Sequence, residues 1–346
     1  MYNSQRAMAK LARYSLAFVS ALCLFSTHSL AQDAKGTLAW VKPSLSSIPP
    51  PRYGAGIAYD LATSSTVLFG GSNTDGNSYL NDTWVSKKDG WVLQSPANSP
   101  SPRTTNMAYD ATTGTVLLFG GYSGSEALGD TWTWDGVTWT EQFPPVSPSP
   151  RLNYGMTFDA ATGTILLFGG AGNGIGNGDV FNDTWEWKGK TKTWTHLFPA
   201  SSPSPRRTTI TYDRATGNVV LFGGDIEQYG CCDTFYGDTW TWNGVTWTQQ
   251  FPSSAPTART GNSLNYDPES GAVILFGGYN NWPDGLGDTW TWNGTTWSEI
   301  QTSFSPPPRW QQSVDLNPNN NSLVLFGGVL TGNSTAGDTW LLVLHR

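Results

Sequence analysis

A unit of about 50 residues occurs six times in this chain of 346 residues. Each copy contains an arginine after proline or alanine, the tripeptide Phe-Gly-Gly 16 or 17 residues later, and then the tripeptide Asp-Thr-Trp. Successive Phe-Gly-Gly tripeptides are separated by 50, 49, 54, 54 and 50 residues. Such a period is typical of a chain that repeats one supersecondary unit around a common core.

Each unit predicts four short strands, a to d. Strand a follows the arginine, and strand b is apolar throughout, as in "TILLFGG" from Thr164, which is typical of a strand buried on both faces. Strand c begins at Asp-Thr-Trp, and an Asp-Gly or Asn-Gly hairpin turn leads from it to strand d. The a–b and c–d turns then emerge on one face, the turn face. The b–c loops and d–a linkers emerge on the other, the loop face.

The repeat resembles the kelch family, in which a glycine pair ends the second strand and two aromatics follow with six residues between them. Four pairs keep that spacing: Trp84/Trp91, Trp132/Trp139, Trp240/Trp247 and Trp290/Trp297. The resemblance implies an all-β, six-bladed kelch-type β-propeller with four antiparallel strands per blade. The expected blades are about 52–94, 103–143, 151–198, 206–251, 259–300 and 309–344.

The sixth unit lacks a fourth strand, because the chain ends soon after "DTWLLVL". Residues 37–42, in "TLAWVKP", resemble the fourth strand of the other units. We therefore expect this N-terminal strand to complete the last blade and to close the ring, since an open ring would leave an unpaired strand edge.

Residues 1–31 read as a cleavable signal peptide with a basic start, a short apolar run and small residues before a cut after Ala31. The mature protein, 32–346, is then expected to be secreted or periplasmic. It would carry 16 basic and 26 acidic residues, a net charge of −10. This balance disfavours nucleic acid as a partner. We also expect no membrane span and a monomer.

The abundant tryptophans have a structural interpretation. Sixteen of the 18 occupy repeat positions. A ligand-binding cage gathers a few aromatics in one place, whereas a pattern repeated around a ring indicates packing between blades. The repeated arginines are likewise interpreted as partners of the Asp-Thr-Trp aspartates rather than as a ring that meets an anion.

Departures from the repeat indicate a ligand site on the loop face of blades four to six. Trp282 and Trp310 are the tryptophans outside repeat positions, and Cys231 and Cys232 are adjacent in a b–c loop, where they could form a vicinal disulfide. The alternative is that the two tryptophans are ordinary surface aromatics and that the two cysteines are thiols without a role. The complete set of candidate ligand residues is Tyr229, Tyr236, Trp282, Trp310, Arg207 and Arg309.

Histidine and cysteine are too scarce for several chemistries. The mature chain keeps two histidines, His196 and His345, and two cysteines. A copper radical site like that of galactose oxidase, a His/Cys zinc site and a Ser-His-Asp triad are therefore not expected, and no metal or cofactor is predicted. Calcium in the Asp/Asn/Gly-rich loops stays open.

Two functions remain. The first is a non-enzymatic module that binds a glycan or a protein on the loop face. The second is an isomerase resembling the exported sialate mutarotases, which are six-bladed kelch proteins. A buried carboxylate beside an arginine in the channel would favour the second, and Asp225, Glu227 and Asp284 are candidates for it by loop position.

Overall fold

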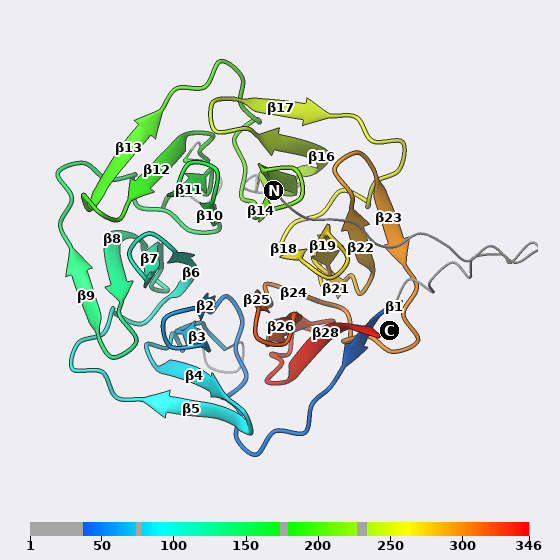
Figure 1. Ribbon diagram of the computed structural model, residues 1–346, viewed down its shortest axis with the longest axis horizontal. Helices are drawn as coiled ribbons and strands as arrows, with labels where there is room; N and C mark the ends of the chain where they lie inside the picture. The colour runs from blue at the N-terminus through cyan, green and yellow to red at the C-terminus, as the bar shows by residue number, and fades with distance from the viewer. Residues whose placement is uncertain (1–36, 74–77, 174–178, 227–233, 346) are drawn as a thin grey trace, which may run out of the picture. The chain divides into compact units, whose positions relative to one another are not determined.

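Six sheets of four antiparallel strands are arranged around a common axis in the computed structural model, as the repeat predicts (Figure 1). The structure describes residues 37–73, 78–173, 179–226 and 234–345. Residues 1–31, the expected signal peptide, lie outside these ranges. No helix among the described residues has the length and apolarity needed to cross a membrane.

Within each blade the strands run outward from the axis in the order a, b, c, d. The a strands are β2 (Gly56–Asp60), β6 (Thr104–Asp110), β10 (Gly155–Asp159), β14 (Ile210–Asp213), β18 (Ser263–Asp267) and β25 (Ser313–Asn317). The b strands are β3 (Ser65–Phe69), β7 (Thr115–Tyr122), β11 (Thr164–Phe168), β15 (Asn218–Ile226), β19 (Ala272–Phe276) and β26 (Ser322–Phe326). All six b strands are almost entirely buried, because each has neighbouring blades on both faces.

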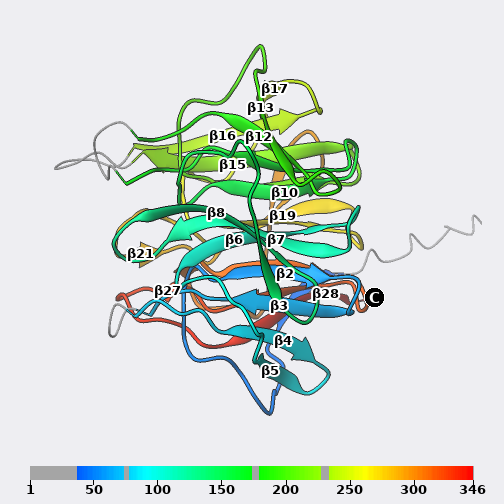
Figure 2. The same ribbon diagram turned by 90° about the vertical axis from the view of Figure 1, so that its left-hand side faces the viewer.

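The c and d strands form the outer half of each blade. The c strands are β4 (Thr83–Lys87), β8 (Ala127–Trp134), β12 (Thr184–Lys188), β16 (Thr234–Trp242), β22 (Thr289–Trp292) and β28 (Thr339–His345). The d strands are β5 (Gly90–Gln94), β9 (Trp139–Gln142), β13 (Thr193–Leu197), β17 (Trp247–Gln250), β23 (Trp297–Ile300) and β1 (Thr37–Val41). Short pairs on the loop face are β20 (Tyr279–Asn281) with β21 (Asp284–Gly285) and β24 (Arg309–Trp310) with β27 (Val329–Leu330) (Figure 2).

The N-terminal strand closes the ring, as predicted. The sheet order of the last blade is β1-β28-β26-β25, and Trp40 pairs with Leu342 in the antiparallel register. The edge of β28 is thereby covered by a strand from the opposite end of the chain.

The glycine pair of each unit is required where neighbouring blades approach most closely. In blade two, Gly121 has φ 109°, and an added Cβ would lie 2.0 Å from the carbonyl oxygen of Thr104. Its N–H donates to the carbonyl of Arg151 in the next blade at 2.9 Å. The same bond recurs at every blade boundary, including Gly328 to Arg52 across the closing seam. A side chain on Gly121 would therefore clash within its own blade, whereas one on the first glycine of the pair would meet the next blade: an added Cβ on Gly70 would lie 2.6 Å from the carbonyl oxygen of Arg103.

The repeated tryptophans also join the blades. In every blade the indole N–H of the d-strand tryptophan donates to the threonine of the preceding blade's Asp-Thr-Trp, at 2.9–3.2 Å. The six pairs are Trp91–Thr339, Trp139–Thr83, Trp194–Thr131, Trp247–Thr184, Trp297–Thr239 and Trp40–Thr289. Because these indoles are buried and bonded within the scaffold, the structural interpretation of the repeated tryptophans is confirmed for this set.

Candidate functional site

A cavity of about 710 Å³ runs through the middle of the ring. Residues of all six a strands line it, and it reaches both faces: Tyr79 and Tyr279 lie at its loop-face end, and Leu61 and Arg214 at its turn-face end. This volume is within the range of pockets that hold a small ligand. The cavity is the common feature around which any candidate site is built.

The loop-face mouth of the cavity carries four tyrosines. They are Tyr53, Tyr79, Tyr122 and Tyr279. The rings of Tyr79 and Tyr122 meet edge to face, with centroids 5.8 Å apart. Burial, with smaller contributions from Tyr53 and Tyr122, raises the pKa of Tyr79 to about 12. Its phenol therefore stays protonated at neutral pH, and the mouth presents apolar ring faces with hydroxyl groups.

A buried ion pair stands at the same mouth. Asp225, at the loop-side end of β15, is fully buried, and the Nε of Arg207 donates to both of its carboxylate oxygens at 3.1 Å. The Nη2 of Arg207 also pairs with Asp225. Backbone bonds between the two residues hold the chains in place, at 2.9 and 3.0 Å. Both residues line the cavity. The sequence named each separately, and the structure brings them together.

The repeated arginines are partners of the Asp-Thr-Trp aspartates, as interpreted from the sequence. In blade one, Arg52 donates from Nη1 and Nη2 to the two carboxylate oxygens of Asp82 at 2.6 and 2.9 Å. Burial alone would raise the pKa of Asp82, but the hydrogen bonds and charge of Arg52, with a bond from Trp84, outweigh it and lower the pKa. Equivalent ion pairs occur in all six blades.

Arg309, one of the candidate ligand residues from the sequence, is among these paired arginines, and so is Arg206. Arg309 is fully buried, and its guanidinium bonds the two oxygens of Asp338 and the carbonyl of Gly327. Arg206 is bound in the same way by Asp238. Both side chains belong to the blade framework rather than to the surface.

Two of the aromatic candidates, Trp310 and Tyr236, pack against other residues of the blades. Trp310 is only 5% exposed and packs on Tyr279, with ring centroids 5.5 Å apart. The ring of Tyr236 stacks on the guanidinium of Arg206, 3.9 Å from its centroid. The sequence named Trp310 as a candidate ligand residue; in the structure it pairs within the β24–β27 ribbon and its side chain is buried.

Trp282 is 64% exposed, in the hairpin between β20 and β21. It keeps the accessibility that a ligand-binding role requires, and Asp284 beside it is exposed as well. Tyr229, Cys231, Cys232 and Glu227 lie outside the described residues, so the vicinal disulfide and their part of the site stay predictions.

Sequence reasoning missed the four tyrosines of the mouth. A signal was present, because Tyr122 and Tyr279 directly follow Phe-Gly-Gly and Tyr53 directly follows the repeated arginine. These positions lie where the strands nearest the axis meet the loop face. No group of three or more His, Cys, Asp or Glu side chains among the described residues is arranged to hold a metal ion. His196 stacks on Trp185, 4.6 Å between centroids, in the outer half of blade three.

The model of the KLHDC2/KLHL20/DRC7 Kelch-repeats domain matches residues 25–211, more than half of the chain. Among solved structures, that of YjhT aligns with a TM-score of 0.64 and 15% identity, covering 88% of this chain and 100% of YjhT. At this identity the likeness to YjhT concerns the fold alone. None of the curated proteins matches the chain.

Proposed function

The chain belongs to the kelch-repeat family, whose propellers serve as protein-interaction or binding modules, and we propose that it is an exported module that binds a glycan at the loop-face mouth of its channel. One observation carries the proposal. Four tyrosines and a buried Arg–Asp pair surround the opening of a cavity of about 710 Å³. Aromatic ring faces stack on the apolar faces of sugars, and phenol and guanidinium groups hydrogen-bond to their hydroxyls.

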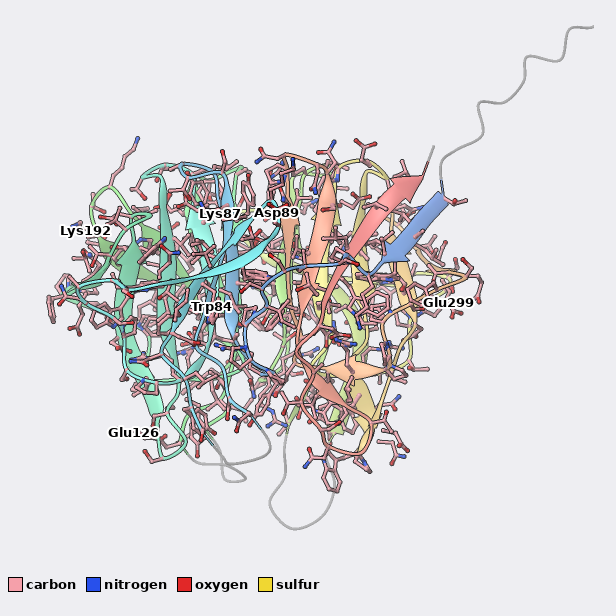
Figure 3. All side chains as sticks on the ribbon, turned by 90° about the horizontal axis from the view of Figure 1, so that it is seen from below. Trp84, Lys87, Asp89, Glu126, Lys192 and Glu299 are labelled. Carbon is pink, nitrogen blue, oxygen red and sulfur yellow. The ribbon has the colours of Figure 1, made fainter. Side chains whose placement is uncertain are left out.

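Charge on this face supports a ligand without negative charge. The two candidate arginines are paired with aspartates, Arg207 with Asp225 and Arg309 with Asp338, and Arg206 is paired with Asp238. Exposed carboxylates of Glu126, Asp179 and Asp284 remain on the loop side. In Figure 3, Glu126 lies at the opposite end of the propeller from Lys87 and Lys192.

A glycan array probed with the mature protein tests the proposal, with a pull-down as the parallel arm for a protein ligand. The informative variants are Tyr79→Ala and Trp282→Ala. A matched control is Val137→Ala, in the exposed c–d turn of blade two. The proposal expects both loop-face variants to weaken glycan binding and the control to bind normally. If no glycan on the array binds and the pull-down captures a protein that contacts the same tyrosines, the ligand is a protein rather than a glycan.

The Arg207–Asp225 pair favours a second candidate, the isomerase resembling sialate mutarotases. Asp225, one of the three candidates by loop position, is a buried carboxylate beside an arginine in the channel. An ionised carboxylate in such a place can accept a proton from a sugar hydroxyl, and an arginine can orient the sugar. Exchange between sialic acid anomers, followed by NMR, separates the candidates: acceleration that is lost in Asp225→Asn supports the isomerase. If the protein leaves the exchange rate unchanged, the isomerase is refuted and the binding module stands.

A further inference from the structure

The turn-face mouth of the channel carries two charged side chains that break the repeat. Arg214 follows the last aspartate of β14, where the other blades have Leu61, Ala111, Ala160, Pro268 and Pro318. Asp315 lies within β25, where the other a strands have Ala58, Ala108, Thr157, Thr211 and Asn265. Both line the cavity, at the end away from the tyrosines described above. Neither charge is demanded by the architecture, since the other blades form without it.

Arg214 has no protein partner among the described residues. Its side chain is exposed, and no hydrogen bond or ion pair joins its guanidinium to another group there. Burial raises the pKa values of Tyr212 and Tyr266, and the positive charge of Arg214 acts against the shift at both phenols. The guanidinium therefore lies close to the tyrosines of blades four and five. Its state contrasts with that of the six repeated arginines, each of which is saturated by an aspartate.

Asp315 is hydrogen-bonded to the backbone of the neighbouring blade. Its Oδ2 accepts the backbone N–H of Tyr59 at 2.6 Å, across the seam between blades six and one. Burial raises the pKa of Asp315 to about 6, while the backbone N–H groups of Tyr59 and Leu316 and, to a smaller extent, the charge of Arg214 act in the opposite direction. Arg214 and Asp315 both line the cavity, and no N–O distance of 4.0 Å or less joins the two side chains. Arg214 and Asp315 thus carry opposite charges in the lining of the same cavity without forming an ion pair.

A small zwitterion matches this arrangement. The planar guanidinium of Arg214 suits a carboxylate, which it can bind through two parallel hydrogen bonds. The carboxylate of Asp315 suits an ammonium group. The partly buried rings of Phe158, Tyr212 and Tyr266 line the cavity beside them and offer an apolar wall. We propose that the turn-face mouth binds a free α-amino acid, with its carboxylate on Arg214 and its ammonium on Asp315. This site goes beyond the proposed glycan site and does not depend on it.

The repeat supplies variants that the fold already tolerates. Arg214→Ala introduces the residue found at the same position in blades two and three, Ala111 and Ala160. Asp315→Asn introduces the residue of blade five, Asn265, whose side chain bonds the neighbouring blade through the carbonyl of Val314 at 3.1 Å. Asparagine also keeps an oxygen to accept the N–H of Tyr59. Lys190→Ala, in an exposed turn of blade three on the same face, is the matched change of charge away from the channel.

Saturation-transfer NMR with the twenty standard L-amino acids, one at a time, tests the site. The amino acid that binds best is then compared with its N-acetyl and its C-terminal amide derivatives by calorimetry. The site predicts binding by the free amino acid and at least about tenfold weaker binding by each derivative, since each lacks one of the two charges. Arg214→Ala and Asp315→Asn should weaken binding by about tenfold each, and Lys190→Ala should not.

Three results would overturn the site: no signal from any of the twenty amino acids, equal binding of the free and derivatised forms, or unchanged affinity in both channel variants. If Asp315→Asn lowers the melting temperature strongly, Arg214→Ala decides alone. Tyr79→Ala, at the opposite mouth, should leave amino-acid binding unchanged. The site and the glycan proposal therefore fail independently.

Discussion

The indole N–H of Trp40 donates to the hydroxyl of Thr289 at 3.1 Å, across the boundary between the last blade and the fifth. The same Trp–Thr bond occurs at the other five boundaries, where the tryptophan comes from the blade's own unit. Trp40 comes from the other end of the sequence, and its ring also packs on Phe276, 5.0 Å between centroids. The N-terminal strand is thus bonded both to its own blade and to the preceding one.

Removing that strand or its tryptophan should open the ring. Trp40→Ala should lower the free energy of unfolding by about 3–5 kcal/mol, because it empties a buried site and leaves the Thr289 hydroxyl without its donor. Deleting residues 32–44 should cost still more. Thermal melts of the mature chain measure both, with the exposed Trp282→Ala as the control. A deletion that melts like the intact chain would contradict closure by β1.

The arginine–aspartate pairs of the repeat should be sensitive to loss of either partner. Asp183→Asn leaves the fully buried Arg151 with an unpaired charge and should cost about 3–5 kcal/mol in urea unfolding. Asp89→Asn, on the turn face, removes a comparable charge from an exposed position and should change stability little. If the two substitutions lowered the free energy of unfolding equally, the ion pairs would contribute no more to stability than an exposed charge does.

Asp315 predicts a stability that falls as the pH rises. Its pKa is raised to about 6 in the folded chain, so the folded state holds the proton more tightly than the unfolded state does. The resulting stabilisation is complete below the ordinary aspartate pKa near 4 and is lost as the pH rises through 6. Asp315→Asn should remove this loss, which for a rise of about two pKa units is roughly 2–3 kcal/mol. Urea unfolding between pH 4 and 7 measures it; parallel pH profiles for the two proteins would refute the assignment.

The two non-repeat tryptophans should behave differently from each other. Trp310 is buried, so Trp310→Ala should destabilise the fold by about 3–5 kcal/mol. Trp282 is exposed, so Trp282→Ala should leave the melting temperature unchanged and weaken binding of a loop-face ligand by about 1–3 kcal/mol. Calorimetry with the ligand and melts without it separate the two effects. Normal binding by Trp282→Ala would place the ligand away from the β20–β21 hairpin.

The cysteine pair predicts that the mature protein has no reactive thiol, because Cys231 and Cys232 are expected to pair with each other. Thiol counting under denaturing, non-reducing conditions checks this. Two reactive thiols per chain would disprove the pairing, and one would indicate a bond between chains.

The repeat made the fold predictable from sequence. A residue that recurs six times, such as the glycine at 121 or the tryptophan at 139, has six equivalent neighbours, so its position identifies its role. The site lacked this redundancy. Whether Trp310 points outward depends on how β24 pairs with β27, and these strands belong to different loops. The meeting of Arg207 with Asp225 likewise depends on two segments 18 residues apart that strand pairing brings side by side.

Closure by β1 has a consequence for how the protein is made. Thr37 pairs with His345, so β1, which is synthesised before the other strands of the ring, can pair only after β28 has been made. The earlier blades can assemble from neighbouring segments, but the final sheet joins ends that are separated by nearly the whole described chain, and such distant contacts form slowly. A nascent chain therefore exposes the edge of the ring until β28 has been made. A cut near either terminus would expose the same seam.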